Sequence, residues 1–169
     1  MKTKSEFLSE EIVELLNYRI EQEEFSSRTY LSMSLWATDK GYLGAGKLFN
    51  KYSEEEMAHA DKARAMLLAN GIQPTTPALK KPEQEFQNLP NAIKKAFNHE
   101  NEITKQCYAL TKAAYKVENY MVAELGLWYC KEQAEELEKF QNLLDRFEAF
   151  GEKTDMLREL DEEMEDLAE

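Results

Sequence analysis

The sequence contains few of the residues that interrupt helices. Its 169 residues include only 6 glycines and 4 prolines, and runs of β-branched residues are scarce. That scarcity disfavours a β-rich chain and is typical of helical proteins. Cysteine is scarce too. The two cysteines, Cys107 and Cys130, have neither metal-ligand nor redox-motif spacing, and Cys107 lies on an apolar face where a small core residue is expected.

Long apolar runs and an excess of positive charge are also missing. No stretch approaches the ~20 apolar residues of a membrane span, and no apolar run follows the first lysines, so no signal peptide is expected. The 21 Lys and Arg are outnumbered by 33 Asp and Glu, which gives a net charge of -12. This balance disfavours nucleic acid and anionic membranes as partners and is compatible with cations as a substrate. We therefore expect a cytoplasmic protein.

Most of the chain shows helical periodicity. Apolar residues recur at intervals of three and four, and glycines or prolines separate the periodic stretches. The length and the 43% hydrophobic content suffice for one domain, residues 1–169, with a substantial core. The expected helices cover residues of about 9–38, 43–70, 89–116, 120–150 and 154–166.

Residues 72–88 break this pattern. The segment contains Pro74, Pro77 and Pro82 and has no helical period. About 17 residues is long for a loop inside a compact domain. Extended, it could span roughly 50 Å, the length of a helix of about 30 residues. We therefore predict a crossover that makes the third helix parallel to the second, in an all-α four-helix bundle with a short fifth helix.

The motif Glu56-x-x-His59 is the first candidate site. Residues three apart share one face of a helix, and this face continues through Phe49 and Tyr52, which are mostly apolar in character. The carboxylate and the imidazole therefore point toward the core, where an uncompensated carboxylate is costly. A cation, a hydrogen-bond network or a metal could compensate it, and the motif alone does not decide among them.

Three further helices each carry an inward acid near the middle, and these are Glu23, Glu100 and Glu136. In an up-down bundle they fall at the same level as Glu56. Any single one could be structural or half exposed, but four at one height are much harder to attribute to coincidence. No Lys or Arg is expected in the inward stripes at that level, and Arg19, one turn from Glu23, is the only local candidate.

Several carboxylates this close cannot all ionise in a low-dielectric interior unless positive charge is present. Two divalent cations would supply that charge. Carboxylates with the imidazole of His59 suit Fe(II), Mn(II) or Zn(II), and Gln133 offers a further oxygen or nitrogen nearby. Two metals bridged by a shared carboxylate would lie about 3.5–4 Å apart. Such a pair can pass two electrons to O₂.

The sequence resembles the bacterial non-haem ferritins over essentially its whole length. The matching stretches are Glu23-Glu24-Phe25-Ser26-Ser27-x-x-Tyr30-Leu31-x-Met33-Ser34, Glu55-Glu56-Met57-x-His59, His99-Glu100 and Trp128-Tyr129-x-x-Glu132-Gln133-x-Glu135-Glu136. Ferritin-like di-iron bundles share the long crossover and the inward carboxylates. His99 itself is expected to point away from the site, toward solvent.

The resemblance implies a di-iron site. The first iron would use Glu23, Glu56 and His59, and the second would use Glu56 as the bridge with Glu100 and Glu136. Gln133 would lie beside the pair, near the incoming dioxygen. Tyr30 and Trp128 could supply an electron, although core packing explains these aromatics equally well. A third iron site nearby would use Glu55, Glu132, Glu135 and Glu136.

The resemblance also implies ferroxidase activity and iron storage. Fe(II) would be oxidised by O₂ or H₂O₂, and Fe(III) would mineralise inside a homo-oligomeric cage of twenty-four subunits, with the fifth helices around four-fold pores. Bacterioferritins carry a second Glu-x-x-His on the fourth helix, and Glu136 stands where its His would be. No haem is therefore expected, although Met57 occupies the position that could ligate haem. Three alternatives remain: a haem-containing bacterioferritin, a non-storing di-iron oxidase or peroxidase, and a structural bundle without metal chemistry.

Overall fold

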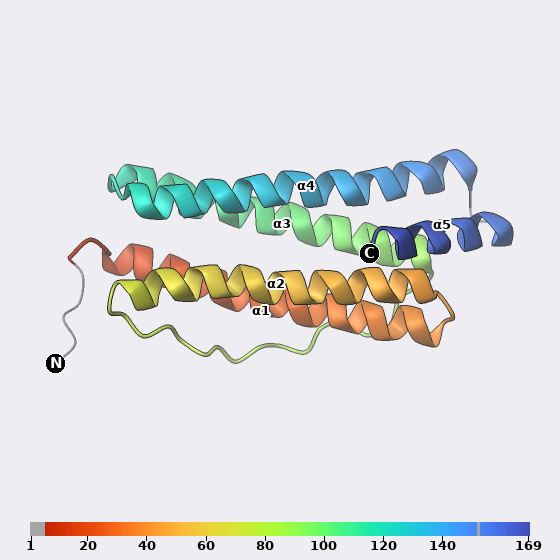
Figure 1. Cartoon of the computed structure of the whole chain (residues 1–169), viewed down its shortest axis with the longest axis horizontal. Coiled ribbons are helices and arrows are strands. Elements are labelled where there is room, and N and C mark those ends of the chain that lie inside the picture. Colours follow the sequence, from red (N-terminus) through yellow and green to blue (C-terminus); the bar gives the residue numbers. More distant parts are fainter. Residues whose placement is uncertain (1–5, 152) are drawn as a thin grey trace.

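The computed structural model describes residues 6–151 and 153–169, most of which are helical (Figure 1). The helices are α1 (Glu10–Asp39), α2 (Leu43–Ala69), α3 (Leu89–Lys116), α4 (Tyr120–Phe150) and α5 (Thr154–Asp166), and these described ranges contain no strand. The predicted all-α bundle with a short fifth helix is therefore confirmed. Within the same ranges, no helix combines the length and the apolar character needed to cross a membrane.

Three of the helices begin at a polar side chain that caps their first turn. Ser9, Asn88 and Asn119 accept hydrogen bonds from the main-chain N–H three residues further on, at 3.4, 2.8 and 3.1 Å. Such caps satisfy main-chain donors that have no partner inside the helix. At the other end of α4, Gly151 adopts a φ of 78°, which a residue with a side chain rarely adopts, and the helix stops there.

The predicted crossover is present and runs along α1. Figure 1 shows it passing from the end of α2 to the opposite end of the bundle, where α3 begins, so α2 and α3 are parallel. Two contacts fix its course. The N–H of Thr75 donates to Asn17 Oδ1 at 2.9 Å, and the Ser32 hydroxyl donates to the carbonyl oxygen of Glu83 at 2.6 Å. The crossover thus follows α1 for about four helical turns.

Helix α5 folds back against the start of α2. The Asp161 carboxylate accepts a hydrogen bond from the N–H of Ala45 at 2.8 Å, so α5 caps α2. Gly44 allows this approach, because a Cβ there would lie 1.7 Å from the main-chain oxygen of Asp161. Leu160 and Met164 bury the apolar side of α5.

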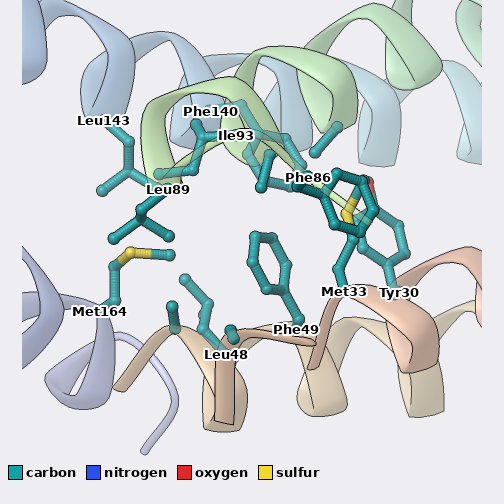
Figure 2. Close-up of a cluster of buried hydrophobic side chains, with 14 of the residues drawn as sticks. Tyr30, Met33, Leu48, Phe49, Phe86, Leu89, Ile93, Phe140, Leu143 and Met164 are labelled. Carbon is teal, nitrogen blue, oxygen red and sulfur yellow. The ribbon is translucent and has the colours of Figure 1, made fainter. Parts of the chain in front are cut away.

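The apolar core is divided into two clusters along the bundle axis. One lies toward α5 and includes Tyr30, Phe49, Ile93 and Phe140 (Figure 2). The other lies toward the opposite end and is built from α1, α2, α3 and α4 residues such as Ile20, Ala63, Ile103 and Tyr129. Each of the four long helices passes from one cluster to the other, and the inward acids lie in the interval between them.

Candidate metal centre

The four expected acids meet in the polar layer between the two apolar clusters. Glu23 comes from α1, Glu56 from α2, Glu100 from α3 and Glu136 from α4, and all four are buried. Each lies on an apolar stripe whose neighbours fill the clusters on either side, so helix packing forces the carboxylates inward. The predicted convergence at one level of the bundle is what the structure shows.

Glu23, Glu56 and His59 form the first cluster. One ligand atom of each lies within 4.8 Å of those of the other two. His59 Nδ1 is 4.0 Å from Glu23 Oε2 and 3.5 Å from Glu56 Oε2. Both carboxylate oxygens are buried, and neither has a hydrogen-bond partner among the residues that the structure describes. Buried oxygens left unpaired beside an imidazole nitrogen fit a cation, which would satisfy all three atoms.

Glu56, Glu100 and Glu136 form the second cluster, again with ligand atoms within 4.8 Å of one another. Gln133 Nε2 donates to Glu100 Oε2 at 3.0 Å and to Glu136 Oε2 at 2.7 Å. The Thr104 hydroxyl donates to Gln133 Oε1 at 2.9 Å, which fixes the orientation of the amide. Because Glu56 belongs to both clusters, the arrangement can hold two cations bridged by one carboxylate.

Burial and neighbouring carboxylates suppress the ionisation of Glu56 and Glu136. Burial is the main reason why the pKa of Glu56 is raised well above its ordinary value, followed by the Glu23 carboxylate and then by Glu136 and Glu100. The pKa of Glu136 is raised in the same way, by burial and then by Glu100. The raised pKa values favour the protonated forms of Glu56 and Glu136, and a divalent cation would displace those protons.

The Tyr30 hydroxyl donates a hydrogen bond to Glu100 Oε1. Burial, and then the charge of Glu100, raises the pKa of Tyr30 well above its ordinary value, so the phenol stays protonated and remains a donor. Trp128, the other predicted aromatic, lies edge-on to the His59 ring with 5.3 Å between centroids. Tyr30 thus contacts the second cluster, and Trp128 contacts the first.

The side chain of Arg19 lies in this polar layer. The sequence had predicted no Lys or Arg there, although it named Arg19 as the nearest candidate. Its side chain is only 1% exposed, and Nε lies 2.7 Å from Glu23 Oε1. The spacing of four residues brings the two side chains together on α1. That spacing is the signal by which the sequence names Arg19 as the local candidate, and the structure corrects the expectation that no Lys or Arg lies inward at this level.

The residues expected to form a third site do not join the two clusters. Within residues 6–151 and 153–169, the metal-competent groups of His, Cys, Asp and Glu include neither Glu55, Glu132 nor Glu135. Glu55 and Glu132 are half-buried, whereas Glu135 is exposed and lies 3.9 Å from Lys131 Nζ. Of the four residues expected in the third site, Glu136 belongs to one of the two clusters. The third site stays a prediction.

His99 is half-buried rather than solvent-facing, which corrects the expectation from sequence. Its Nε2 lies 2.7 Å from the Ser26 hydroxyl, and its ring meets Phe25 and Tyr30 edge-on. The contact with α1 draws the ring between the helices. Burial lowers the pKa of His99, which favours the neutral imidazole.

Comparison with known proteins agrees with this architecture. Residues 13–150 match the family described as "Ferritin-like domain". A probable bacterial non-heme ferritin-like protein from Haemophilus influenzae is 31% identical over 95% of this chain and 98% of its own length. A bacterial non-heme ferritin from Campylobacter jejuni is 32% identical over 95% of this chain and 96% of its own.

Solved structures extend the agreement to three dimensions. An open pore ferritin from the hyperthermophilic archaeon Archaeoglobus fulgidus superposes with a TM-score of 0.91 at 27% sequence identity, and the match covers 94% of this chain and 97% of that one. The resemblance to bacterial non-haem ferritins is thereby confirmed over nearly the whole chain. The chain belongs to the family of ferritin-like domains.

Proposed function

We propose that this protein is an iron-storing ferroxidase. Fe(II) is its substrate, and the polar layer between the two apolar clusters is its oxidation site. The observation that carries this proposal is the sharing of Glu56 between two sets of metal-competent side chains. A shared carboxylate can hold two Fe(II) ions side by side, and an acceptor that takes two electrons needs two such ions.

The ligands divide between two positions. Glu23, Glu56 and His59 hold the first Fe(II) through the imidazole nitrogen and two carboxylate oxygens that have no hydrogen-bond partner within the described ranges. Glu56, Glu100 and Glu136 hold the second. The protons that burial keeps on Glu56 and Glu136 leave as the cations bind, because the positive charge stabilises the ionised carboxylates.

Oxidation then balances in a simple way. Two Fe(II) ions each give one electron to O₂, which takes up two protons and becomes H₂O₂, or one molecule of H₂O₂ is reduced to two of water in the same manner. Gln133 positions Glu100 and Glu136 through its amide and lies beside the reacting pair. Tyr30 orients Glu100 and is the candidate donor of a further electron.

The product Fe(III) leaves for storage. In our proposal Glu55, Glu132, Glu135 and Glu136 form a third, weaker site on its way out, and the mineral grows inside a cage of twenty-four subunits. The free thiols of Cys107 and Cys130 fit a reducing compartment such as the cytoplasm. No haem takes part in this scheme.

Variants of the shared carboxylate and of the imidazole test the site. Glu56→Ala and His59→Ala should abolish rapid Fe(II) oxidation under air, followed by the absorbance of Fe(III), and leave the oligomer intact. Glu54→Ala is the matched control, because Glu54 is exposed on the same helix and accepts a hydrogen bond of 2.9 Å from Asn50, outside the two clusters. Oxidation at the wild-type rate by both site variants would overturn the assignment.

Size-exclusion chromatography with in-line iron detection tests storage. After aerobic loading with a large excess of Fe(II), iron far beyond the capacity of a dinuclear site should elute with a particle of several hundred kilodaltons. Oxidised iron at the capacity of the dinuclear site alone, on a small oligomer, would indicate a non-storing di-iron oxidase instead. Protein unable to bind Fe(II) would indicate a structural bundle.

A further inference from the structure

Arg19 is a buried cation on one side of the candidate centre. Its Nε lies 2.7 Å from Glu23 Oε1, and its Nη1 lies 3.6 Å from Cys107 Sγ. The guanidinium carbon is 6.0 Å from the centroid of the Tyr129 ring. Neither Nε nor Nη2 has a hydrogen-bond partner among the residues that the structure describes. Within the described part of the chain, Glu23 is thus the carboxylate that compensates this charge at contact distance.

The contact divides the Glu23 carboxylate into two unequal oxygens. Oε1 faces Arg19, whereas Oε2 faces His59 Nδ1 at 4.0 Å and has no other partner in the described part of the chain. Oε2 is therefore the oxygen that lies on the side of the first metal position. Burial alone would lower the pKa of the Arg19 guanidinium, but nearby groups, Glu23 first among them, raise it above its ordinary value. The guanidinium therefore stays charged.

Charge differs between the two clusters as a result. Glu23 and Glu56 carry at most two negative charges toward the first position, and Arg19 offsets one of them. Glu56, Glu100 and Glu136 carry up to three toward the second position. Lys139 is the cation that acts on the pKa of Glu136, but its side chain is exposed, so solvent screens its charge.

We infer that Arg19 makes the two metal positions unequal, so that the first divalent cation to enter each chain binds at Glu56, Glu100 and Glu136. This inference rests on the proposed function, because it concerns the same pair of positions. A positive charge held close to the first position repels a divalent cation there, and burial of Arg19 and Glu23 leaves that repulsion weakly screened. Arg19 is a positioning residue, since it touches the ligand Glu23 and not the substrate.

Ordered filling has a consequence for the reaction. One Fe(II) at the second position can give only one electron, whereas O₂ needs two for reduction to H₂O₂. Oxidation then waits until a second Fe(II) overcomes the weaker binding at Glu23 and His59. Arg19 would thereby set the Fe(II) concentration at which oxidation begins.

Zinc(II), which does not change oxidation state, is the probe for the test. Wild-type crystals are soaked with less than one Zn(II) per chain, and anomalous scattering locates the ion. We expect density among Glu56, Glu100 and Glu136. Density first, or equally, at the Glu23 and His59 position would overturn the inference alone. Zinc in neither cluster would overturn the proposed function and this inference with it.

Substitutions at Arg19 give the second readout, which is the Kd of each position measured by titration calorimetry. Arg19→Gln removes the charge, and we expect the Kd for Zn(II) at the Glu23 and His59 position to fall by about tenfold, so that the two positions fill together. Arg19→Lys keeps the charge and should keep the wild-type order. Unchanged Kd values in Arg19→Gln would contradict the inference.

Arg64→Gln is the matched control. Arg64 is a half-buried arginine of α2 that pairs with Glu24 and Asp61, neither of which belongs to the two clusters. Its removal should leave both Kd values as in the wild type. If Arg19→Gln does not fold, the zinc position in the wild type and in Arg19→Lys still tests the inference. Both proteins retain the positive charge, so both must bind the first zinc ion at Glu56, Glu100 and Glu136.

Discussion

Tyr129 on α4 donates a hydrogen bond of 2.7 Å to the main-chain carbonyl oxygen of His59 on α2. Burial raises the pKa of Tyr129, so its hydroxyl stays protonated. Trp128, the preceding residue, meets the His59 ring edge-on. Two consecutive residues of α4 thus hold the turn of α2 that presents the imidazole, and the first cluster depends on contacts outside its own ligands.

Tyr129→Phe should loosen this support without emptying the core. The ring remains, and the lost hydrogen bond should lower the free energy of unfolding by about 1 kcal/mol, measured by denaturation of the metal-free protein in guanidinium. The Kd for Zn(II) at the Glu23 and His59 position should rise a few-fold. Tyr108→Phe, at an exposed position of α3, is the control. A variant with wild-type zinc affinity would show that the hydrogen bond does not position His59.

Glu56 and Glu136 should contribute less to the stability of the metal-free protein as the pH rises. Because the folded-state pKa values of Glu56 and Glu136 are raised, the folded protein keeps protons that the unfolded chain has already lost. The unfolded state then binds fewer protons, so these two groups stabilise the fold fully below the ordinary value of 4.5. Their contribution is lost as the pH rises through the raised values.

Glu136→Gln is the variant that isolates this effect. Its free energy of unfolding, measured across the same pH range, should depend less on pH than that of the wild type, since one buried titrating group is gone. Calorimetry in buffers of different ionisation enthalpy should also show fewer protons released on Zn(II) binding. Equal pH slopes for the two proteins would contradict the prediction.

The helical periodicity of the sequence predicted most of the fold and the meeting of the four buried acids. Glu23, Glu56, Glu100 and Glu136 were predicted to meet because each interrupts an apolar stripe near the middle of a long helix. Such a position leaves a carboxylate no route to solvent once the helices pack. The crossover followed from residues 72–88, whose prolines exclude a helix and whose length suits a span of the bundle.

The features of the site that the sequence could not predict depend on side-chain contacts between different helices. Thr104 orients Gln133 across the gap from α3 to α4, and Ser26 draws His99 inward from α1 to α3. These pairs depend on the rotation and height of two helices, which the period of one helix does not fix. Arg19 shows the same limit, since the apolar packing that buries it beside Cys107 comes from α3.

Gly44→Ala should undock α5. A Cβ at residue 44 would overlap the main-chain oxygen of Asp161, 1.7 Å away, and main chain cannot turn aside as a side-chain tip can. We expect a loss of about 1–3 kcal/mol in stability and faster amide hydrogen exchange across α5. Asp161→Asn, which keeps an oxygen to accept from Ala45, should leave α5 docked. Unchanged exchange in Gly44→Ala would show that α2 and α5 can separate slightly at little cost.

Tyr30→Phe separates the two roles assigned to Tyr30. The ring packs face to face with Phe49 and Phe140, at centroid distances of 6.3 and 6.1 Å, so the variant should fold. Without the hydroxyl, Glu100 loses a donor, and the Kd for Zn(II) at the Glu56, Glu100 and Glu136 position should rise about two- to tenfold.

Electron paramagnetic resonance addresses the second role. If Tyr30 supplies an electron, reaction of the Fe(II)-loaded wild type with H₂O₂ should produce a tyrosyl radical that Tyr30→Phe lacks. Tyr52→Phe is the control, because that ring lies 5.5 Å from Tyr30 in the same cluster. A radical that persists in Tyr30→Phe would assign the electron to another aromatic residue. Weaker zinc binding without any radical in the wild type would leave Tyr30 the single task of orienting Glu100.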